Sequence, residues 1–359
     1  MMSALQSTIA TPATASSSIP PNRQVFGSSR APTNPGLHER LLGSFVGAVG
    51  MSCWVRRRSR WRQTNHVGKL KVTRFALADN VDSLLLDLDG VLFEANKPIA
   101  GSREALLALR AAGKRIFCVT NNAARTRAQV AAKIQQIVNV PIAEAEVVTS
   151  AWAAATVLQG VLASGQKVYA CGEEGLLTEL ANAGVDFVTT QYEQHMSEGD
   201  FEKLANGGLD PDVAAVCLGF DSSFTYAKLC IASLYIQNGA TFYCTNTDAY
   251  NKVGGARMPR TGCLLDSLQR AVGQEAIVVG KPSGRFMDQV VDRYKLDRSR
   301  TLMVGDRLDT DIAFGNRNGV QTCLVLSGVS SQAEVDLLQG SDERIPNYVR
   351  ADLQGLLLS

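Results

Sequence analysis

The chain has 359 residues, of which 45% are hydrophobic and 19% are charged, and its formal net charge is +2. This length suggests two domains or one domain with a large insertion, and the composition excludes a wholly disordered, collagen-like or multi-spanning membrane protein. The net charge conceals an asymmetry, because residues 1–78 hold 11 Lys or Arg and one acidic residue, which leaves 25 basic and 33 acidic residues for the rest. A body of this acidity lacks the basic surface that nucleic-acid binding requires.

Residues 1–78 are predicted to be a disordered targeting segment and not a folded domain. Ser, Thr, Ala and Pro dominate its first 36 residues, and an uncharged stretch at 41–55 precedes an arginine cluster at 56–62. This Ser-rich, Arg-rich and acid-poor composition is typical of an organelle transit peptide. We expect a plastid, with a mitochondrion or the cytoplasm as alternatives. The uncharged stretch is shorter than the roughly 20 residues that cross a bilayer. No later stretch is long and apolar enough to span a membrane, so no membrane is expected for the mature protein.

From residue 81 onward, apolar runs alternate with helical patterns. Strands are predicted at "SLLLDLDG" (83–90) and "RIFCVTNN" (115–122), each followed by a helical pattern, at 102–114 and 125–137. The alternation returns late in the chain, with strand signals in "EAIVVGKPS", "TLMVGD" and "QTCLVLSG". Continuous apolar strands that alternate with helices indicate parallel βαβ units. The predicted fold class is therefore α/β, with a doubly wound, Rossmann-like parallel sheet.

The region between these halves has strand and helix signals of its own, such as "QKVYACG" and "TFYCTN". We interpret it as an α/β cap domain inserted into the core. The predicted boundaries are listed here in chain order: core first half 79–162, cap 163–273, core second half 274–351 and C-terminal tail 352–359.

Polar side chains follow four of the predicted strands where each strand ends. In open parallel sheets, ligands bind at the carboxyl ends of the strands. Carboxylates, one lysine and hydroxyl or amide groups together suit Mg²⁺ and a phosphate, because hard oxygen ligands hold Mg²⁺ and the ion offsets carboxylate repulsion. A carboxylate can also attack phosphorus and form an aspartyl-phosphate. The candidate residues are Asp87 and Asp89, then Thr120, Asn121 and Asn122, then Lys281, and finally Asp306, Asp309 and Asp311.

The ordered set "DLDGV", the Thr of "VTNN", the Lys of "GKPS" and "GDRLDTD" resembles the haloacid dehalogenase superfamily of phosphatases. The resemblance implies that Asp87 is the nucleophile, and that Asp89 protonates the leaving alkoxide and then activates water. It also implies that Thr120, Asn121 and Asn122 hold the phosphoryl oxygens while Lys281 neutralises charge.

The same resemblance implies how the ion is held. Mg²⁺ would be bound by Asp87, Asp306 and the backbone carbonyl of Asp89, with Asp311 one step further out, orienting the metal's water molecules or Lys281. Asp309 is the acidic residue that we least expect to be a ligand, since a helix N-cap or a solvated position suits it better.

The length of the insertion resembles the larger, C2-type cap of this superfamily, and residues 79–351 look most like its eukaryotic phosphoglycolate phosphatases. The resemblance implies hydrolysis of 2-phosphoglycolate to glycolate and phosphate, with glycerol 3-phosphate, pyridoxal phosphate or 4-nitrophenyl phosphate as alternative substrates. A small carboxylate substrate needs donors or a cation. The polar loop at 245–262 offers several, and no one of them is singled out: Asn246, Asn251, Lys252, Arg257 and Arg260.

Two other classes of protein remain as alternatives. A phospho-aspartate receiver would also use acidic residues, Thr, Lys and Mg²⁺, but it lacks a counterpart of Asp89 and a cap of this size. A catalytically idle relative that only binds ligands would have no reason to keep every part of the site. The expected partner is a small phosphate ester, and related capped enzymes imply a possible homodimer through the cap.

Overall fold

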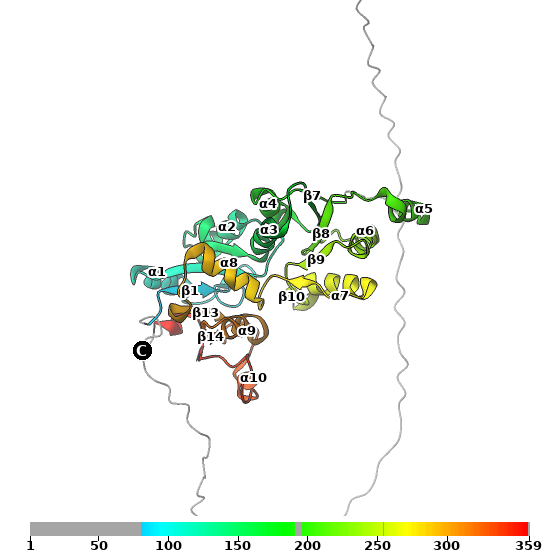
Figure 1. Cartoon of the computed structure of the whole chain (residues 1–359). Helices are drawn as coiled ribbons and strands as arrows, with labels where there is room; N and C mark the ends of the chain where they lie inside the picture. Colours follow the sequence, from blue (N-terminus) through cyan, green and yellow to red (C-terminus); the bar gives the residue numbers. More distant parts are fainter. Residues whose placement is uncertain (1–79, 191–195, 254, 358–359) are drawn as a thin grey trace, which may run out of the picture. The chain divides into compact units, whose positions relative to one another are not determined.

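The computed structural model describes residues 80–190, 196–253 and 255–357 (Figure 1). The predicted targeting segment lies outside the described residues. Within them are two parallel β-sheets with helices packed against them. None of the described helices is both long enough and apolar enough to span a bilayer.

The first sheet has six parallel strands in the order β15-β14-β13-β1-β4-β5. The chain leaves β1 toward β4 and β5 on one side and later returns through β13, β14 and β15 on the other. The order therefore reverses beside β1, which makes a topological switch point there and confirms the doubly wound prediction. The strand bounds are β1 (Ser83–Leu86), β4 (Arg115–Thr120), β5 (Val147–Thr149), β13 (Thr301–Gly305), β14 (Gln321–Val325) and β15 (Tyr348–Arg350).

Both faces of this sheet are buried, which explains the continuous apolar strands. Along β1, Leu85 belongs to one hydrophobic cluster while Leu84 and Leu86 belong to another, so neighbouring side chains point to opposite faces. Helices α1 and α2 pack in the second of these clusters, and α8 and α9 pack in the first. The helix bounds are α1 (Ser102–Ala111), α2 (Arg127–Val138), α3 (Ser150–Val161), α8 (Gly284–Tyr294), α9 (Ala313–Arg317) and α10 (Gln332–Asp336).

The second sheet has five parallel strands in the order β12-β9-β8-β6-β7 and falls largely within the predicted cap. Helices α6 and α7 pack against each other, with α6 also against β8 (Figure 1). The bounds are β6 (Lys167–Cys171), β7 (Phe187–Val188), β8 (Val213–Leu218), β9 (Thr241–Cys244), β12 (Ile277–Val278), α4 (Glu174–Asn182), α5 (Glu198–Lys203), α6 (Tyr226–Gln237) and α7 (Thr261–Val272).

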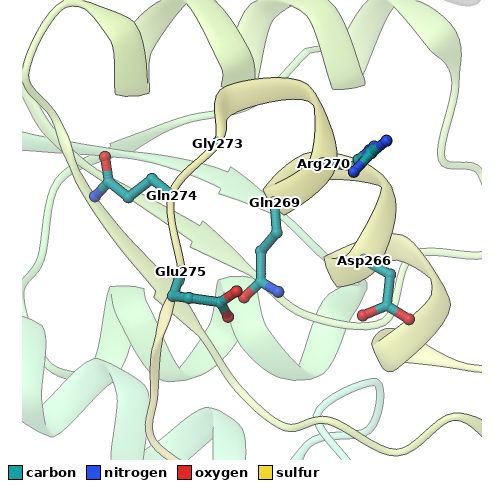
Figure 2. Close-up of a pocket in the computed structure, with 6 residues that line it drawn as sticks. All are labelled: Asp266, Gln269, Arg270, Gly273, Gln274 and Glu275. Carbon is teal, nitrogen blue, oxygen red and sulfur yellow. The ribbon is translucent and has the colours of Figure 1, made fainter.

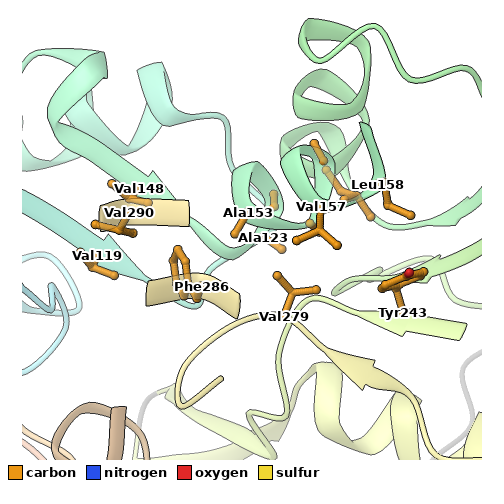
Figure 3. Close-up of a cluster of buried hydrophobic side chains, with 14 of the residues drawn as sticks. Val119, Ala123, Val148, Ala153, Val157, Leu158, Tyr243, Val279, Phe286 and Val290 are labelled. Carbon is orange, nitrogen blue, oxygen red and sulfur yellow. The ribbon is translucent and has the colours of Figure 1, made fainter. Parts of the chain in front are cut away.

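A single hydrophobic cluster joins the two sheets. Figure 3 shows Val119 and Val148 of the first sheet in the same cluster as Tyr243 of the second, with Val157 and Phe286 between. Helix α3 contacts both α4 and α8, so it bridges the core and the cap. This shared packing connects the core and the cap.

Strand β12 corrects one predicted boundary. We assigned its apolar run to the core, but Ile277 and Val278 pair with Tyr243 and Cys244 of β9 in the second sheet. The sequence of a two-residue apolar strand does not indicate which sheet the strand joins. Its neighbour across the ladder decides this, and the sequence does not show that neighbour.

Two further segments differ from the sequence interpretation. The segment 245–262, expected to be a loop, contains the antiparallel hairpin of β10 (Tyr250–Val253) and β11 (Ala256–Pro259), with Gly255 in a left-handed conformation before β11. The predicted tail contributes Leu353 and Leu356 to the core as buried residues. The remaining elements are the hairpin β2 (Phe93–Glu94)–β3 (Lys97–Pro98), 3₁₀ turns at Glu144–Glu146, Arg298–Arg300 and Leu353–Leu356, and π-helical turns at Leu204–Gly208 and Leu308–Ile312.

Candidate active site

Lys281 lies at the centre of the candidate site and is only 2% exposed. Its Nζ donates hydrogen bonds to Asp87 Oδ1 at 2.5 Å, to Asp311 Oδ1 at 2.7 Å and to the carbonyl of Val119 at 3.1 Å. Burial disfavours the charged amine, but the carboxylates of Asp311 and Asp87 outweigh this and raise the pKa of Lys281 above its ordinary value. Lys281 is thus a fixed positive charge, and the structure brings it together with Asp87 and Asp311 as the sequence predicted.

Asn121 holds the backbone of Lys281 in place. Its Oδ1 accepts from the N–H of Lys281 at 2.8 Å, and its Nδ2 donates to the carbonyl of Lys281 at 3.2 Å and to Asp248 Oδ1 at 3.1 Å. The family resemblance implied that backbone and side-chain donors of Asn121 hold the phosphoryl oxygens. In the structure its amide is already engaged, so only the backbone N–H of Asn121 can serve the predicted role.

Thr120 and Asn122 form the turn that follows β4. The Thr120 hydroxyl accepts from the N–H of Asn122 at 3.1 Å, and Asn122 Oδ1 accepts from the N–H of Ala124 at 2.9 Å. The hydroxyl hydrogen of Thr120 stays available to an anion. These contacts set the shape of a loop that presents hydroxyl and backbone donors at the carboxyl end of β4.

Asp87, Asp306 and Asp311 form a carboxylate cluster in which one oxygen from each residue lies within 4.8 Å of the others. Asp306 is 2% exposed; its Oδ2 accepts from the N–H of Val329 at 2.7 Å, and its Oδ1 has no hydrogen-bond partner among the described residues. Burial, with the charge of Asp311, raises the pKa of Asp306 to about 7. Burial also raises the pKa of Asp87. A buried, unpartnered carboxylate oxygen beside other carboxylates fits a hard divalent cation.

Asp87 and Asp306 each keep a carboxylate oxygen that could bind a metal ion, whereas both oxygens of Asp311 accept hydrogen bonds. Asp311 Oδ1 accepts from Lys281, and its Oδ2 accepts from the N–H of Arg307 at 3.2 Å. Asp87 and Asp306 therefore fit the role of direct ligands, while Asp311 fits the predicted outer position. Gly90, with φ of +86°, allows the backbone to pass directly against Asp306, where a Cβ would overlap the carboxylate.

Binding of Mg²⁺ is expected to stabilise the folded protein. At about 100 times its Kd, a ligand adds roughly 2.7 kcal/mol to the free energy of unfolding, so Tm should rise by several degrees over the value in EDTA. Asp306→Asn should lose this rise and melt above wild type in EDTA, because it removes a poorly solvated charge from the cluster. Asp309→Asn is the matched control and should keep the rise. An undiminished Mg²⁺ response in Asp306→Asn would contradict the assignment.

Asp89 stands at the open side of the site, with its side chain 66% exposed. Desolvation by its surroundings still raises the pKa of Asp89, an effect that Lys133, 4.0 Å away, opposes. A carboxyl group with a raised pKa is suited to donating a proton near neutral pH. Asp309, by contrast, pairs with Arg307 at 2.8 Å and is exposed, so it lies outside the cluster, as expected.

The cap contributes two residues that tie it to the core. Asn246 Nδ2 donates to the carbonyl of Asn121 at 2.8 Å, and Asp248 accepts from the Asn121 amide. Asn246 was a candidate for reading the substrate, but its burial and this bond make it a link between the two sheets. The sequence analysis missed Asp248, although its place in "TNTD" directly after β9 was the available signal.

A shallow depression beside the end of α7 is separate from this site (Figure 2). Asp266, Gln269 and Arg270 of α7 line it together with Gly273, Gln274 and Glu275. It contains none of the predicted site residues. The predicted site residues are therefore gathered elsewhere, after strands of the two sheets.

Comparisons with known proteins agree with this architecture. Sequence models described as haloacid dehalogenase-like hydrolase and HAD-hydrolase-like match residues 84–186 and 278–356. The chain is 40% identical over 300 residues to a glycerol-3-phosphate phosphatase from Gallus gallus, covering 79% of this chain and 94% of that protein. It is 39% identical over 296 residues to the chloroplastic phosphoglycolate phosphatase 1A from Arabidopsis thaliana, covering 78% of each.

The solved structures show the same relationship. A glycerol phosphate phosphatase from Mycobacterium tuberculosis in complex with magnesium superposes with a TM-score of 0.68 at 32% identity, covering 78% of each chain. The unmatched residues between the two segments contain β7, β8 and β9 of the second sheet, so the match is interrupted within the cap. The chain belongs to the haloacid dehalogenase-like hydrolases, and it is a capped phosphatase of that family.

Proposed function

We propose that this protein is a Mg²⁺-dependent phosphatase that hydrolyses 2-phosphoglycolate to glycolate and phosphate through an aspartyl-phosphate on Asp87. The observation that carries the reaction type is the arrangement of Lys281 between Asp87 and Asp311 beside the unpartnered oxygen of Asp306. Three carboxylates and one ammonium carry a net charge of −2, which one divalent cation would neutralise. When bound, Mg²⁺ would supply the positive charge that a phosphoryl group needs in order to approach these carboxylates.

Asp87 would be the nucleophile. Lys281 holds its Oδ1 at 2.5 Å and so orients the carboxylate, whose other oxygen would attack phosphorus. The P–O bond to the leaving alkoxide would break as the bond to Asp87 forms, with Thr120 and backbone N–H groups donating to the phosphoryl oxygens.

Asp89 would move the protons. Protonated Asp89 would give its proton to the leaving glycolate oxygen, and its carboxylate would then take a proton from the water that attacks the phosphoryl phosphorus. The bond to Asp87 breaks, phosphate leaves, and both carboxyl groups return to their starting states. The raised pKa of Asp89 and its exposure at the open side of the site suit this double role.

The similar proteins are named for two different substrates. One is named for phosphoglycolate and chloroplasts, and another of equal similarity is named for glycerol 3-phosphate. The predicted plastid leader favours phosphoglycolate and a plastid location, and it makes glycerol 3-phosphate the second candidate. A homodimer formed through the cap is part of the same proposal.

The substrate proposal predicts a ranking of specificity constants. Phosphate release should be compared for 2-phosphoglycolate, glycerol 3-phosphate, pyridoxal phosphate and 4-nitrophenyl phosphate, with Mg²⁺ or with EDTA. We expect kcat/KM for 2-phosphoglycolate to exceed the others by at least about tenfold, the factor that roughly 1.4 kcal/mol of selective binding supplies. Preference for glycerol 3-phosphate would retain the mechanism and overturn the substrate. Full turnover in EDTA would overturn the metal requirement.

A further inference from the structure

Arg260 lies where the cap meets the core site. It stands between β11 and α7, and its N–H donates to the carbonyl of Ala249 at 3.0 Å. The N–H of Gly262 donates to the carbonyl of Asp248 at 2.9 Å. These two bonds fasten the start of α7 to the loop after β9. Since Asp248 bonds Asn121, which holds Lys281, Arg260 is tied by a short chain of contacts to the catalytic lysine.

The guanidinium of Arg260 lies among residues that follow strands of both sheets. It lies over the ring of Phe220, which follows β8, with its central carbon 3.7 Å from the ring centroid. The carboxylates whose charges act on it are Asp248, Glu173 and Asp89, which follow β9, β6 and β1. Residues from the carboxyl ends of both sheets therefore surround this one cation.

Arg260 differs from three other half-buried cations in having no carboxylate close to its guanidinium. Arg127, Lys228 and Arg307 each have a carboxylate oxygen within 2.8 Å. Between residues 80 and 357, as far as these are described, the side chain of Arg260 makes no hydrogen bond and no ion pair shorter than 4.0 Å. A guanidinium carries five N–H donors, and leaving them unmatched while partly desolvated is costly. Burial accordingly lowers the pKa of Arg260.

Among the described residues, no carboxylate oxygen lies within 4.0 Å of the guanidinium: Asp248 accepts from Asn121, and Glu173 accepts from the N–H of Ser222 at 3.1 Å. A planar carboxylate of the substrate would match the guanidinium fork with two parallel hydrogen bonds.

We propose that Arg260 is the residue that binds the carboxylate at the non-phosphate end of the substrate and thereby selects phosphorylated hydroxy acids over phosphorylated polyols. This inference rests on the proposed phosphatase activity, in which Lys281 and the carboxylate cluster hold the phosphate end of the substrate, and on the electrostatic interaction of Arg260 with Asp89 of that site. A glycerol moiety has no charge to pair with Arg260 and would gain less from it.

The test compares Arg260→Gln and Arg260→Lys with wild type in the full chain, on 2-phosphoglycolate, glycerol 3-phosphate and 4-nitrophenyl phosphate. We expect Arg260→Gln to lower kcat/KM for 2-phosphoglycolate by roughly 10- to 100-fold, mainly through KM, and to lower it much less for the two esters whose tails carry no charge. Arg260→Lys should recover part of the loss. Arg270→Gln, which removes an exposed cation from the far end of α7, is the matched control and should change none of the three.

The ratio of the kcat/KM values is the deciding readout, because partial misfolding would lower kcat/KM for all three substrates by the same factor. An unchanged ratio in Arg260→Gln would overturn this inference, whichever substrate the wild type prefers. A wild type that prefers glycerol 3-phosphate, with a selective loss on 2-phosphoglycolate in Arg260→Gln, would overturn the proposed substrate and support the role of Arg260. The two failures are therefore distinguishable.

Discussion

Asp87→Asn is expected to lower kcat by roughly 10⁴-fold or more, the scale of losing a covalent nucleophile. An amide cannot form the aspartyl-phosphate, and it removes one of the charges that would hold Mg²⁺. The Asn side chain keeps the size of Asp and can still accept from Lys281, so the fold should persist. Phosphate release under saturating substrate measures the effect.

Asp309→Asn serves as the control for that experiment, because Asp309 is an exposed carboxylate paired with Arg307 outside the cluster. Its kcat should match wild type. Activity of Asp87→Asn within about tenfold of wild type would mean that no bond to Asp87 forms during turnover.

Asp89→Asn is expected to lower kcat for 2-phosphoglycolate by roughly 10²- to 10⁴-fold, the range for a lost general acid or base. The loss in the first step should be smaller with 4-nitrophenyl phosphate, because its phenolate leaves without needing a proton. Since wild-type Asp89 must be protonated to act as the acid, its raised pKa extends activity upward in pH, and activity should fall as pH rises past that pKa. The variant should lack this alkaline decline.

Single-turnover kinetics with the two esters check this prediction, because they separate the phosphorylation of Asp87 from the later attack of water. Equal losses in the first step for both esters would show that Asp89 does not protonate the leaving group. Full activity with 2-phosphoglycolate would require another proton donor in the crevice.

The core of the fold could be predicted because its strands bury both faces. "SLLL" and "TLMVG" are continuous apolar runs between helical patterns, and they form β1 and β13, side by side in the sheet. Helix α3 had no comparable signal, since most of its residues between Ser150 and Val161 are buried. A helix that is enclosed on most sides lacks the polar face that gives helices their sequence period.

The site was predictable to the extent that it depends on strand ends. Asp87 and Asp306 follow β1 and β13, and a parallel sheet gathers such residues at the carboxyl ends of its strands. Lys281 follows β12 of the second sheet, so its place beside them depends on how the two sheets pack. The bonds of Asn121 to Lys281 and Asp248 were not predictable, because they join segments 160 and 127 residues apart. The position of Arg260 near the site depends on the packing of α7 against the loop after β9. The local sequence "PRTG" does not indicate this packing.

The most direct test of the proposed mechanism is the mass of the protein during turnover. Asp89→Asn should form the aspartyl-phosphate from 4-nitrophenyl phosphate and hydrolyse it slowly, because it lacks the base that activates water. Acid quenching and mass spectrometry should then show the mass gain of one phosphoryl group, located by proteolysis on the peptide that contains Asp87. The gain should disappear in the double variant Asp87→Asn/Asp89→Asn. Turnover without any phosphorylated protein, or a phosphoryl group on a different residue, would contradict the assignment of Asp87 as the nucleophile.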